Sequence, residues 1–435
     1  MPEPNDRRDF DYVVYGASGF TGQYVLEKLA QALKEKPHAS FAVAGRNQLK
    51  LKKVLAESSK IIDQDLNDTE IIIADSNEPE SLEKMARRCR VLLNCVGPYR
   101  LHGEPVVKAC VDAGTSHVDI SGEPAFLESM QAKYHQDAVD NKCYVVGACG
   151  WDSVPADLLV DFLRRHFDGD LNAIETCAEQ KPGPNGYVLN SGTYQTILLS
   201  LAHVDDLRGV RKQIMPERIQ TLPPKLQPRG QLFYDDRVNG WCVVFPGSDK
   251  SVIARSIYHN YHQLNQRPFQ VHAYFKLGSL VRALATAVWF GLISLLVKFG
   301  AGLKFAQEHV ALVSFGAFSN DGPTRLQANT STFTYWAFGR GWAERSDEKT
   351  ATHDTPPDKR MTARCDGPDA GYNATAACLV ASAMSITEDA EQMPNNGGVY
   401  TPAVAFGNTK LLDRLSDLGV TFKIVETTNE PAREE

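Results

Sequence analysis

A glycine-rich segment near the start of the chain places the strongest constraint on the fold. The apolar run 12–15 (YVVY) leads into three glycines spaced G-x-x-G-x-x-G, and the helix-forming sequence QYVLEKLAQAL follows. A strand that turns tightly into a helix presents backbone N–H groups and the positive end of the helix dipole to one point, which suits a pyrophosphate. The alternative is an ordinary glycine-rich turn, because the spacing differs from G-x-G-x-x-G. We expect cofactor contacts from Gly16, Ser18, Gly19, Phe20, Thr21 and Gly22.

The first third of the chain alternates between apolar runs and helix-period stretches. The apolar runs are 12–15, 41–44, 71–74, 91–93 and 144–146. Continuous apolar runs of this length suit parallel strands that are buried on both faces. The pattern therefore predicts an α/β fold, with a Rossmann-type doubly wound parallel sheet over residues 1–155 and helices on both of its faces.

Beyond residue 155 the alternation stops and strand candidates are separated by longer polar connections. Among these candidates are 173–180, 241–246, 251–258 and 328–338, while helices are expected over 193–204, 372–386 and 408–418. The sequence predicts a second α/β domain with α+β character over 156–425, including the apolar stretch 278–318. Residues 426–435 are expected to form a flexible tail.

The residues after the second and third strands bear on the choice of dinucleotide. An NAD site is expected to place an acidic side chain after the second strand, to bind the ribose 2′-hydroxyl. This chain instead has Arg46 and Asn47 there. The Arg46 guanidinium suits a 2′-phosphate, which favours NADP(H); the alternative is a solvated cation. Asp75, after the third strand, is a candidate partner for the adenine amino group or an N-cap of the next helix.

The fourth strand is followed by NCVGPY (94–99), at the edge where doubly wound sheets bind ligands. We expect this loop to face the nicotinamide ribose through Cys95, Val96, Gly97 and Pro98. The candidate proton donors are Tyr99 and Asp119. The alternative for Tyr99 is that its ring only packs in the core, and the alternative for Asp119 is that it caps the helix that starts near Pro124. Capping of the helix that starts near Pro124 is expected for Glu123. Cys95 is expected to be a small apolar residue without basic neighbours.

Composition excludes several classes of function. With 46 basic and 53 acidic side chains the formal net charge is -7, so no global positive field favours nucleic acid. The nine cysteines are scattered and odd in number, which indicates reduced thiols in an intracellular protein. The histidines show no H-E-x-x-H spacing, and we expect no metal site. The N-terminal residues show neither a signal-peptide nor a presequence pattern.

One apolar segment departs from the pattern of a water-soluble enzyme. Residues 283–297 (ALATAVWFGLISLLV) carry no charge and are flanked by Arg282 and Lys298. As a helix this segment would be about 22 Å long, which is short of a bilayer core. The sequence suits a monotopic hairpin or an interfacial helix on a membrane or lipid droplet. The alternatives are a buried helix and an oligomer interface, and the second alternative would make the protein a homodimer.

Several motifs together resemble the saccharopine dehydrogenase-like oxidoreductases, a group that includes lipid-droplet-associated animal members and is related to trans-acting enoyl reductases of glycolipid biosynthesis. The motifs are GASGFTG (16–22), AGR (44–46), NCVGPY (94–99), GEPV (103–106), HVDISGE (117–123), GWDSVPAD (150–157), PGSD (246–249), GPDAGY (367–372) and GGVYTP (397–402). The resemblance implies an NADP(H)-binding Rossmann domain followed by an α/β domain.

The resemblance does not imply saccharopine as the substrate. Between 147 and 200 the only cationic side chains are Arg164, Arg165 and Lys181, too few to hold a substrate with several carboxylates. We therefore expect an NADP(H)-dependent oxidoreductase of lipid metabolism that acts on a lipid-like substrate, at the cytosolic side of a membrane or lipid droplet. The alternative is a catalytically inactive nucleotide-binding scaffold or interaction protein.

Overall fold

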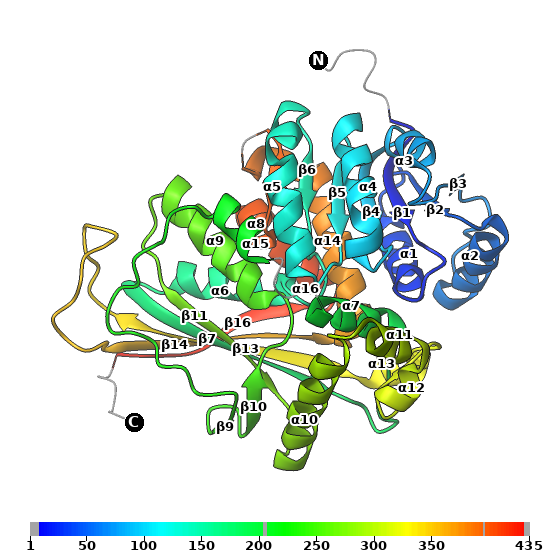
Figure 1. The fold of residues 1–435 in the computed structure, drawn as a ribbon. Coiled ribbons are helices and arrows are strands. Elements are labelled where there is room, and N and C mark those ends of the chain that lie inside the picture. The colour runs from blue at the N-terminus through cyan, green and yellow to red at the C-terminus, as the bar shows by residue number, and fades with distance from the viewer. Residues whose placement is uncertain (1–7, 203–206, 395, 430–435) are drawn as a thin grey trace. The chain divides into compact units, whose positions relative to one another are not determined.

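The computed structural model describes residues 8–202, 207–394 and 396–429. These residues form two compact units (Figure 1). Unit 1 comprises Met1–Trp151 and Gly371–Leu418, and unit 2 comprises Asp152–Ala370 and Gly419–Glu435. The chain therefore leaves unit 1, builds unit 2, and returns to unit 1 before its last strand.

Unit 1 is built on a seven-stranded sheet in the order β15-β6-β5-β4-β1-β2-β3. All its strand pairs are parallel, which confirms the predicted α/β class with a Rossmann-like parallel sheet. The strands are β1 Phe10–Tyr15, β2 Phe41–Gly45, β3 Ile71–Ile73, β4 Cys89–Asn94, β5 Ser116–Asp119, β6 Tyr144–Val146 and β15 Gly398–Tyr400. Most residues of the central strands β1 and β4 are buried, as expected when helices cover both faces of a sheet.

The helices of unit 1 cover the two faces of this sheet. One set, α1, α2 and α14, packs together with α16, and the other set is α3, α4 and α5. The bounds are α1 Phe20–Leu33, α2 Gln48–Ile62, α3 Pro79–Ala86, α4 Tyr99–Ala113, α5 Pro124–Asp140, α14 Thr375–Glu388, α15 Pro402–Phe406 and α16 Leu411–Asp417. A π-helical turn at Ala370–Ala374 leads into α14, and a 3-10 turn at Ala390–Gln392 follows it.

The return of 371–418 to unit 1 differs from the sequence expectation, which placed these residues in a second domain over 156–425. Two features explain it. Strand β15 pairs with β6, and every residue of α14 from Thr375 to Ile386 is buried. A helix that is apolar on all sides must be enclosed by its neighbours, and α14 is enclosed by α1, β4 and β5.

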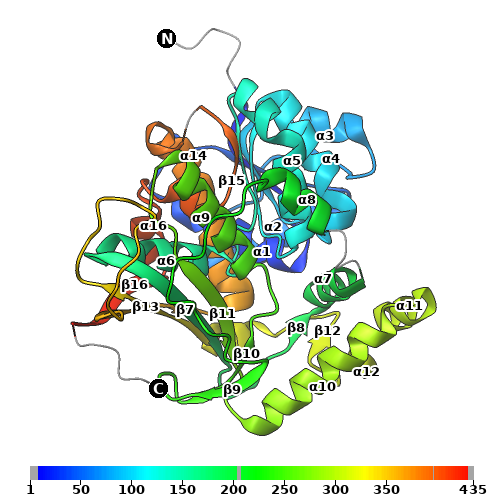
Figure 2. The same cartoon turned by 60° about the vertical axis from the view of Figure 1, so that its left-hand side comes forward.

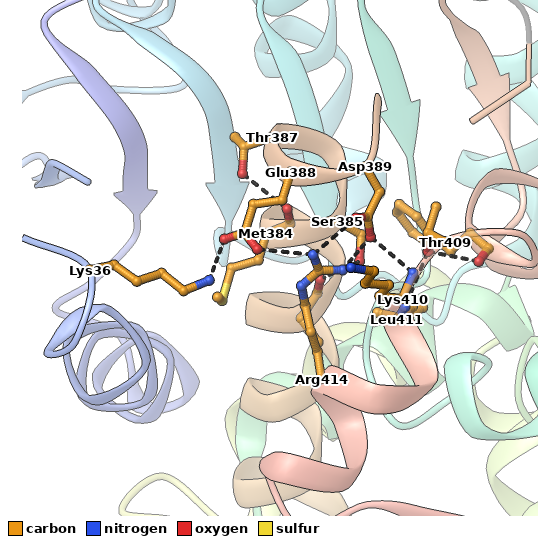
Figure 3. Close-up of polar contacts among 12 residues, drawn as sticks. Lys36, Met384, Ser385, Thr387, Glu388, Asp389, Thr409, Lys410, Leu411 and Arg414 are labelled. Atoms are coloured by element: carbon orange, nitrogen blue, oxygen red, sulfur yellow. Dashed lines mark hydrogen bonds and ion pairs between the residues drawn. The ribbon is translucent and has the colours of Figure 1, made fainter. Parts of the chain in front are cut away.

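Ion pairs hold the C-terminal end of α14 in unit 1 (Figure 3). Arg414 on α16 binds Glu388 at 2.9 Å and also pairs with Asp389. Glu388 in turn pairs with Lys36, just after α1. The side chain of Arg414 is only 12% exposed, so these contacts are partly protected from solvent. The cluster fastens α16 and the end of α1 to the same helix.

Unit 2 is built on a mixed seven-stranded sheet in the order β16-β14-β13-β7-β11-β10-β9. Only the pair of β7 and β11 is parallel in this sheet, as far as the described residues show. The strands are β7 Asp170–Lys181, β9 Leu232–Asp235, β10 Gly240–Val244, β11 Gln270–Lys276, β13 Thr332–Trp342, β14 Lys359–Pro368 and β16 Thr421–Thr428. A separate short pair joins β8 Leu189–Asn190 to β12 Phe318–Ser319. Strand β16 includes residues 426–428, so the expected tail was wrong there; residues 430–435 lie outside the described residues.

Helices α6 and α9 pack together against sheet strands of unit 2. The helices of this unit are α6 Val154–His166, α7 Ser191–Ala202, α8 Leu207–Ile214, α9 Asp249–Gln263, α10 Leu280–Leu296, α11 Gly300–Glu308, α12 Val310–Val313 and α13 Arg325–Thr330. The strand expected over 251–258 was wrong, because this segment lies in α9. Its buried residues Val252, Ile253, Arg255 and Ser256 recur at helical spacing.

The apolar segment of the sequence forms α10, which lies at the margin of unit 2 (Figure 2). Ala283 and Ile293 are its buried residues, and the helix packs against α7, α11 and β10. No helix in the described part of the chain is both long enough and apolar enough to cross a membrane. The helix is not fully buried, since Val281, Val288 and Leu292 are among its exposed residues.

Candidate functional site

The glycine loop between β1 and α1 is a tight turn that only glycine permits at two positions. Gly16 has a φ of 86°, and a Cβ there would lie 2.8 Å from a methyl carbon of Val96. A Cβ at Gly22 would lie 2.1 Å from the carbonyl oxygen of Gly16. The loop closes through a bond of 2.8 Å from the Gly19 N–H to the Gly16 carbonyl. These contacts fit a backbone that a pyrophosphate approaches closely.

The N-terminus of α1 leaves backbone donors for a ligand. Gly19 is the N-cap, and within the described chain no side chain caps this end of the helix. The first N–H groups of a helix, here those of Phe20, Thr21 and Gly22, have no partner within the helix itself. The first turn also carries no acidic residue, so the positive end of the helix dipole is not compensated there. Ser18, in the loop, is partly exposed.

The ring of Phe20 packs within unit 1. It lies 4.7 Å from the ring of Tyr372 and 5.8 Å from that of Tyr24, between ring centroids. Tyr372 belongs to the π-helical turn before α14, from the GPDAGY motif. The C-terminal part of unit 1 therefore supports the glycine loop. Sequence reasoning missed this contact because 352 residues separate the two rings.

The end of β2 presents Arg46 beside Asp75. The side chain of Arg46 is 71% exposed, and its Nε lies 4.0 Å from Asp75 Oδ2. Asp75 Oδ1 accepts bonds from the backbone and side chain of Asn77, so Asp75 shapes a turn. The next helix has Glu78 at its N-cap, and Asp75 does not occupy that position. Asn47 caps α2 by accepting from the Lys50 N–H at 3.0 Å. Arg46 is thus a largely solvated cation at the position where a 2′-phosphate is expected.

The loop after β4 contacts the glycine loop. The carbonyl carbon of Cys95 lies 3.2 Å from the position of a Cβ on Gly16. The Cys95 N–H donates to the Tyr15 carbonyl, and the Val96 N–H donates to Asn94 Oδ1. Gly97 is exposed and Pro98, the N-cap of α4, is partly exposed. Burial raises the pKa of the Cys95 thiol to about 12, so this cysteine is not a thiolate at neutral pH.

The hydroxyl of Tyr99 is engaged with backbone groups. It donates to the Asn94 carbonyl at 2.8 Å and accepts from the Ile120 N–H at 3.3 Å. Burial holds the pKa of the Tyr99 phenol well above its usual value. Tyr99 thereby joins the loops that follow β4 and β5, and this geometry favours its packing role.

Glu123 caps a different helix from the one expected. Its carboxylate accepts from the backbone N–H groups of Tyr99 and Arg100, at 2.8 and 2.9 Å, and so caps α4. Glu123 does occupy the N-cap position of the helix that begins at Pro124, as expected, but its side chain makes no capping bond to α5. A carboxylate at a helix N-terminus satisfies free N–H groups and complements the dipole.

Three polar side chains are buried together under the carboxyl ends of β4 and β5. Asn94 and Asp119 are paired in register, and Asn94 Nδ2 lies 3.2 Å from His117 Nε2. Because Asn94 Oδ1 already accepts from Val96, its amide nitrogen donates to Nε2, and the proton of neutral His117 resides on Nδ1. Nδ1 faces Asp119 Oδ2 at 3.8 Å. Sequence reasoning did not select Asn94 or His117 as site residues, although they are the first residues of the motifs NCVGPY and HVDISGE.

Burial shifts the titration of this cluster in opposite directions. The pKa of Asp119 is raised to about 7 by desolvation, although Oδ1 accepts from the N–H groups of Ser121 and Ala148. The pKa of His117 is lowered to about 3 by desolvation. The described residues include no group of three or more His, Cys, Asp or Glu side chains able to hold a metal ion.

Unit 1 is a dinucleotide-binding domain of the Rossmann type. It is defined as such by its parallel sheet, by its glycine loop and by the N-terminus of α1, whose helix dipole is not compensated. Residues 12–146 match the family model described as the saccharopine dehydrogenase NADP binding domain. Across the whole chain, a lipid droplet localized protein of Caenorhabditis elegans is 44% identical, over 95% of this chain and 98% of its own length. The human saccharopine dehydrogenase-like oxidoreductase is 38% identical, over 97% and 99%. The chain belongs to the family of saccharopine dehydrogenase-like oxidoreductases.

Two more distant comparisons agree with this placement. A putative trans-acting enoyl reductase of Mycobacterium tuberculosis is 29% identical over 96% of this chain and 97% of its own. The solved structure of apo saccharopine dehydrogenase (L-Glu forming) from Saccharomyces cerevisiae covers 96% of this chain and 100% of its own, with a TM-score of 0.52 and 15% identity. The second likeness concerns the fold alone.

Proposed function

We propose that this protein is an NADP(H)-dependent oxidoreductase that acts on a lipid-like substrate at the surface of a lipid droplet or membrane. The observation that carries the lipid part of the proposal is an apolar stripe on α10, which consists of Val281, Leu284, Val288, Leu292 and Leu295. Each of these side chains is between 49% and 77% exposed. The family supports the oxidoreductase part.

The stripe lies along one side of the helix. At 3.6 residues per turn its five members fall within an arc of roughly 80°. Exposed Phe299, Phe305, Leu312 and Phe315 extend the apolar surface along the following segment. Exposed Arg282 follows Val281 at the start of the stripe and exposed Lys298 lies beyond its end, and both side chains suit lipid phosphates. A contiguous exposed apolar face bordered by cations is typical of an interfacial helix that lies in a lipid monolayer.

The residues of unit 1 would hold the cofactor as follows. The glycine loop and the start of α1 suit the pyrophosphate, and the exposed Arg46 suits a 2′-phosphate, which favours NADP(H) over NAD(H). Asp75 would accept from the adenine amino group, and the loop 95–98 would face the nicotinamide ribose. We assign Tyr99 and Asp119 the role of positioning residues, because both are buried and bonded to backbone groups.

The lipid-like substrate follows from the surface and from the relatives. A protein that binds a monolayer meets apolar substrates where they are concentrated. One relative is named for lipid droplet localization and another is named a putative enoyl reductase. A long-chain carbonyl or enoyl compound is therefore the substrate class we propose.

The test uses the full chain with defined probes. NADPH and NADH are first titrated separately, and binding is followed by the fluorescence of the reduced nicotinamide. Hexadecanal and trans-2-hexadecenal are then supplied in triolein droplets coated with phosphatidylcholine, and NADPH oxidation is measured. We expect saturable, NADPH-selective binding and probe-dependent oxidation. NADPH binding without oxidation of either probe would instead support the nucleotide-binding scaffold.

A further inference from the structure

The mixed sheet of unit 2 is covered by α6 and α9 on one of its faces (Figure 1). A Cβ on Gly339 of β13 would lie 2.6 Å from a methyl carbon of Leu163 in α6, so the side of β13 on which Gly339 lies meets this helix. Successive side chains of a strand point to opposite faces. Trp336, Phe338 and Arg340 of β13 therefore lie on the other face, which we call the outer face of the sheet.

Two arginines lie side by side on the outer face. Arg340 of β13 and Arg360 of β14 are partners in the antiparallel register. The Cβ atoms of such partners are roughly 4.5–5.5 Å apart, and two like charges in this arrangement destabilise the sheet. Arg360 is exposed and Arg340 is partly buried. The pair therefore lowers the stability of the fold unless an anion offsets the two charges.

The carboxylates next to this part of the sheet are already bound by other arginines. Glu175 of β7 lies on the outer face, as the register partner of Phe338. Its carboxylate is bound by Arg229 at 3.0 Å and by Arg237 at 2.8 Å. The same two arginines bind Asp235, at 3.5 and 2.7 Å. Two carboxylates and two guanidinium groups thus neutralise one another, and this cluster has no negative charge left for the arginine pair.

The charge of Arg340 is not offset from within the described chain. Its Nε is buried and has no hydrogen-bond partner there. Neither Arg340 nor Arg360 forms an ion pair with a carboxylate in the part of the chain that the structure describes. Burial lowers the pKa of the Arg340 guanidinium and the charge of Arg360 acts in the same direction, while Glu175 opposes this shift without reversing it. A buried donor without an acceptor costs free energy, which a bound anion would reduce.

The strand is shaped around Arg340. The register between β13 and β7 shifts between Arg340 and Gly341. Irregularities of this kind change the direction of a side chain and are frequent next to binding sites. The guanidinium carbon of Arg237 lies 4.1 Å from the ring centroid of Phe338, two residues before Arg340. Arg340 is thus held between a covered aromatic ring on its own strand and the exposed Arg360 on the next.

We propose that Arg340 and Arg360 form a binding site for a phosphate group on the outer face of the unit 2 sheet. Guanidinium groups carry N–H donors in a planar fork that matches the oxygens of a phosphate. A dianionic phosphate bound to the terminal nitrogens of both side chains offsets the two charges that the strand register brings together. The site lies within unit 2 and does not depend on the proposed function. Phosphorylated small molecules and the head group of phosphatidic acid both carry the phosphate monoester that this site suits.

The first measurement is urea unfolding of the full chain, in sodium chloride and in sodium phosphate of equal ionic strength. The variant is Arg360→Gln, which changes an exposed side chain, and the control is Arg345→Gln, since Arg345 is 68% exposed elsewhere in unit 2. A ligand that binds only the folded chain stabilises it. We expect phosphate to raise the urea midpoint of the wild type and of the control more than that of Arg360→Gln. Equal shifts in the three proteins would overturn the proposal.

The second measurement is calorimetric titration of the full chain with glycerol 3-phosphate. We expect the Kd to rise by roughly tenfold or more in Arg360→Gln and in Arg340→Gln, and to stay unchanged in Arg345→Gln. Equal affinities in the wild type and the two variants of the pair would overturn the proposal. A loss of binding in Arg46→Gln instead would place the phosphate in unit 1, and it would overturn the proposal as well.

The third measurement identifies what carries the phosphate. Flotation of the full chain is compared between phosphatidylcholine vesicles with and without phosphatidic acid. The apolar stripe of α10 is expected to bind both kinds of vesicle, so the difference between them reports on the phosphate head group. A preference for phosphatidic acid that Arg360→Gln loses would support the site with a lipid head group as its ligand. Glycerol 3-phosphate binding that depends on the pair, without this preference, would support the site with a phosphorylated small molecule. Binding of neither probe by the wild type would overturn the proposal and leave the proposed function intact.

Discussion

The carboxylate of Glu123 accepts the backbone N–H of Tyr99 at 2.8 Å, across 24 residues of sequence. Its other oxygen accepts the next N–H, that of Arg100. The start of α5 therefore caps the start of α4, on the side of the sheet where the loops after β4 and β5 meet. A side chain that is only 3% exposed makes both bonds, so water cannot easily replace them.

We expect Glu123→Gln to lower the free energy of unfolding by about 1–2 kcal/mol, because the amide can accept only one of the two N–H groups and opposes the other with its own N–H. Urea unfolding of the purified protein measures this change. The matched control is Glu104→Gln, since Glu104 is 42% exposed and pairs with Lys133 on the surface. Equal stability of the Glu123 variant and this control would show that the cap contributes nothing.

The pKa shifts of Asp119 and His117 have opposite directions, so their effects on how the free energy of unfolding varies with pH oppose each other. A variant that lacks one of the two groups should therefore show the effect of the other. The folded pKa of Asp119 is raised from 3.8 to about 7, so its contribution is present below about pH 4 and is lost as the pH rises towards 7. The folded pKa of His117 is lowered from 6.5 to about 3, so its contribution is present above pH 6.5 and is lost as the pH falls. Between about pH 4 and 6.5 the two slopes have opposite signs and largely cancel.

We therefore expect Asp119→Asn to become more stable as the pH rises from about 4 to 6.5, and His117→Asn to become less stable over the same range. Each change is on the order of 4 kcal/mol if the full shifts apply. Urea unfolding at half-unit pH intervals tests this, with the wild type as the nearly flat reference. Identical slopes in the three proteins would mean that the two groups do not titrate as their burial implies.

The sequence predicted the parallel sheet because its strands are buried on both faces and are therefore continuous apolar runs. The same reasoning failed for the segment of α9, where SVIARSIY has β-branched residues at positions that a strand would also use. It could not find β15, a strand of three residues that pairs with β6 across some 250 residues of chain. Short pairings of this kind depend on tertiary contacts and leave little local signal.

The candidate site likewise has a part that the sequence predicts and a part that it does not. The glycine loop and Arg46 can be predicted, because a tight turn and the end of a strand, both visible in the local sequence, determine where they lie. The contacts of Glu123 with α4, of Phe20 with Tyr372, and of His117 with Asn94 join distant segments. Buried polar residues such as His117 look like surface residues in a sequence, since only the folded chain supplies the partners that permit their burial.

Arg46 should determine the preference between the two dinucleotides. We expect Arg46→Glu to weaken NADPH binding by roughly 10- to 100-fold, because a carboxylate replaces the cation that pairs with a 2′-phosphate, and to leave NADH binding unchanged or improved. Fluorescence titration with both nucleotides measures this. Lys50→Glu, an equal change of charge at an exposed position of α2, is the control. Parallel losses for NADPH and NADH would mean that Arg46 does not read the phosphate.

The apolar stripe of α10 should determine attachment to lipid. Val288 and Leu292 are 60% and 62% exposed near the middle of the stripe, so replacing both with glutamate removes apolar contact and adds repulsion from lipid phosphates without disturbing a packed core. We expect the fraction of the double variant that floats with triolein droplets coated with phosphatidylcholine to fall by roughly tenfold or more.

The matched control replaces Leu49 and Ile61 of α2, which are 79% and 55% exposed, with glutamate. This control carries the same change of charge and should float like the wild type, with NADPH binding intact in both variants. Flotation that is equal in the two double variants would exclude α10 as the lipid-binding surface and would leave its exposed face to a protein partner.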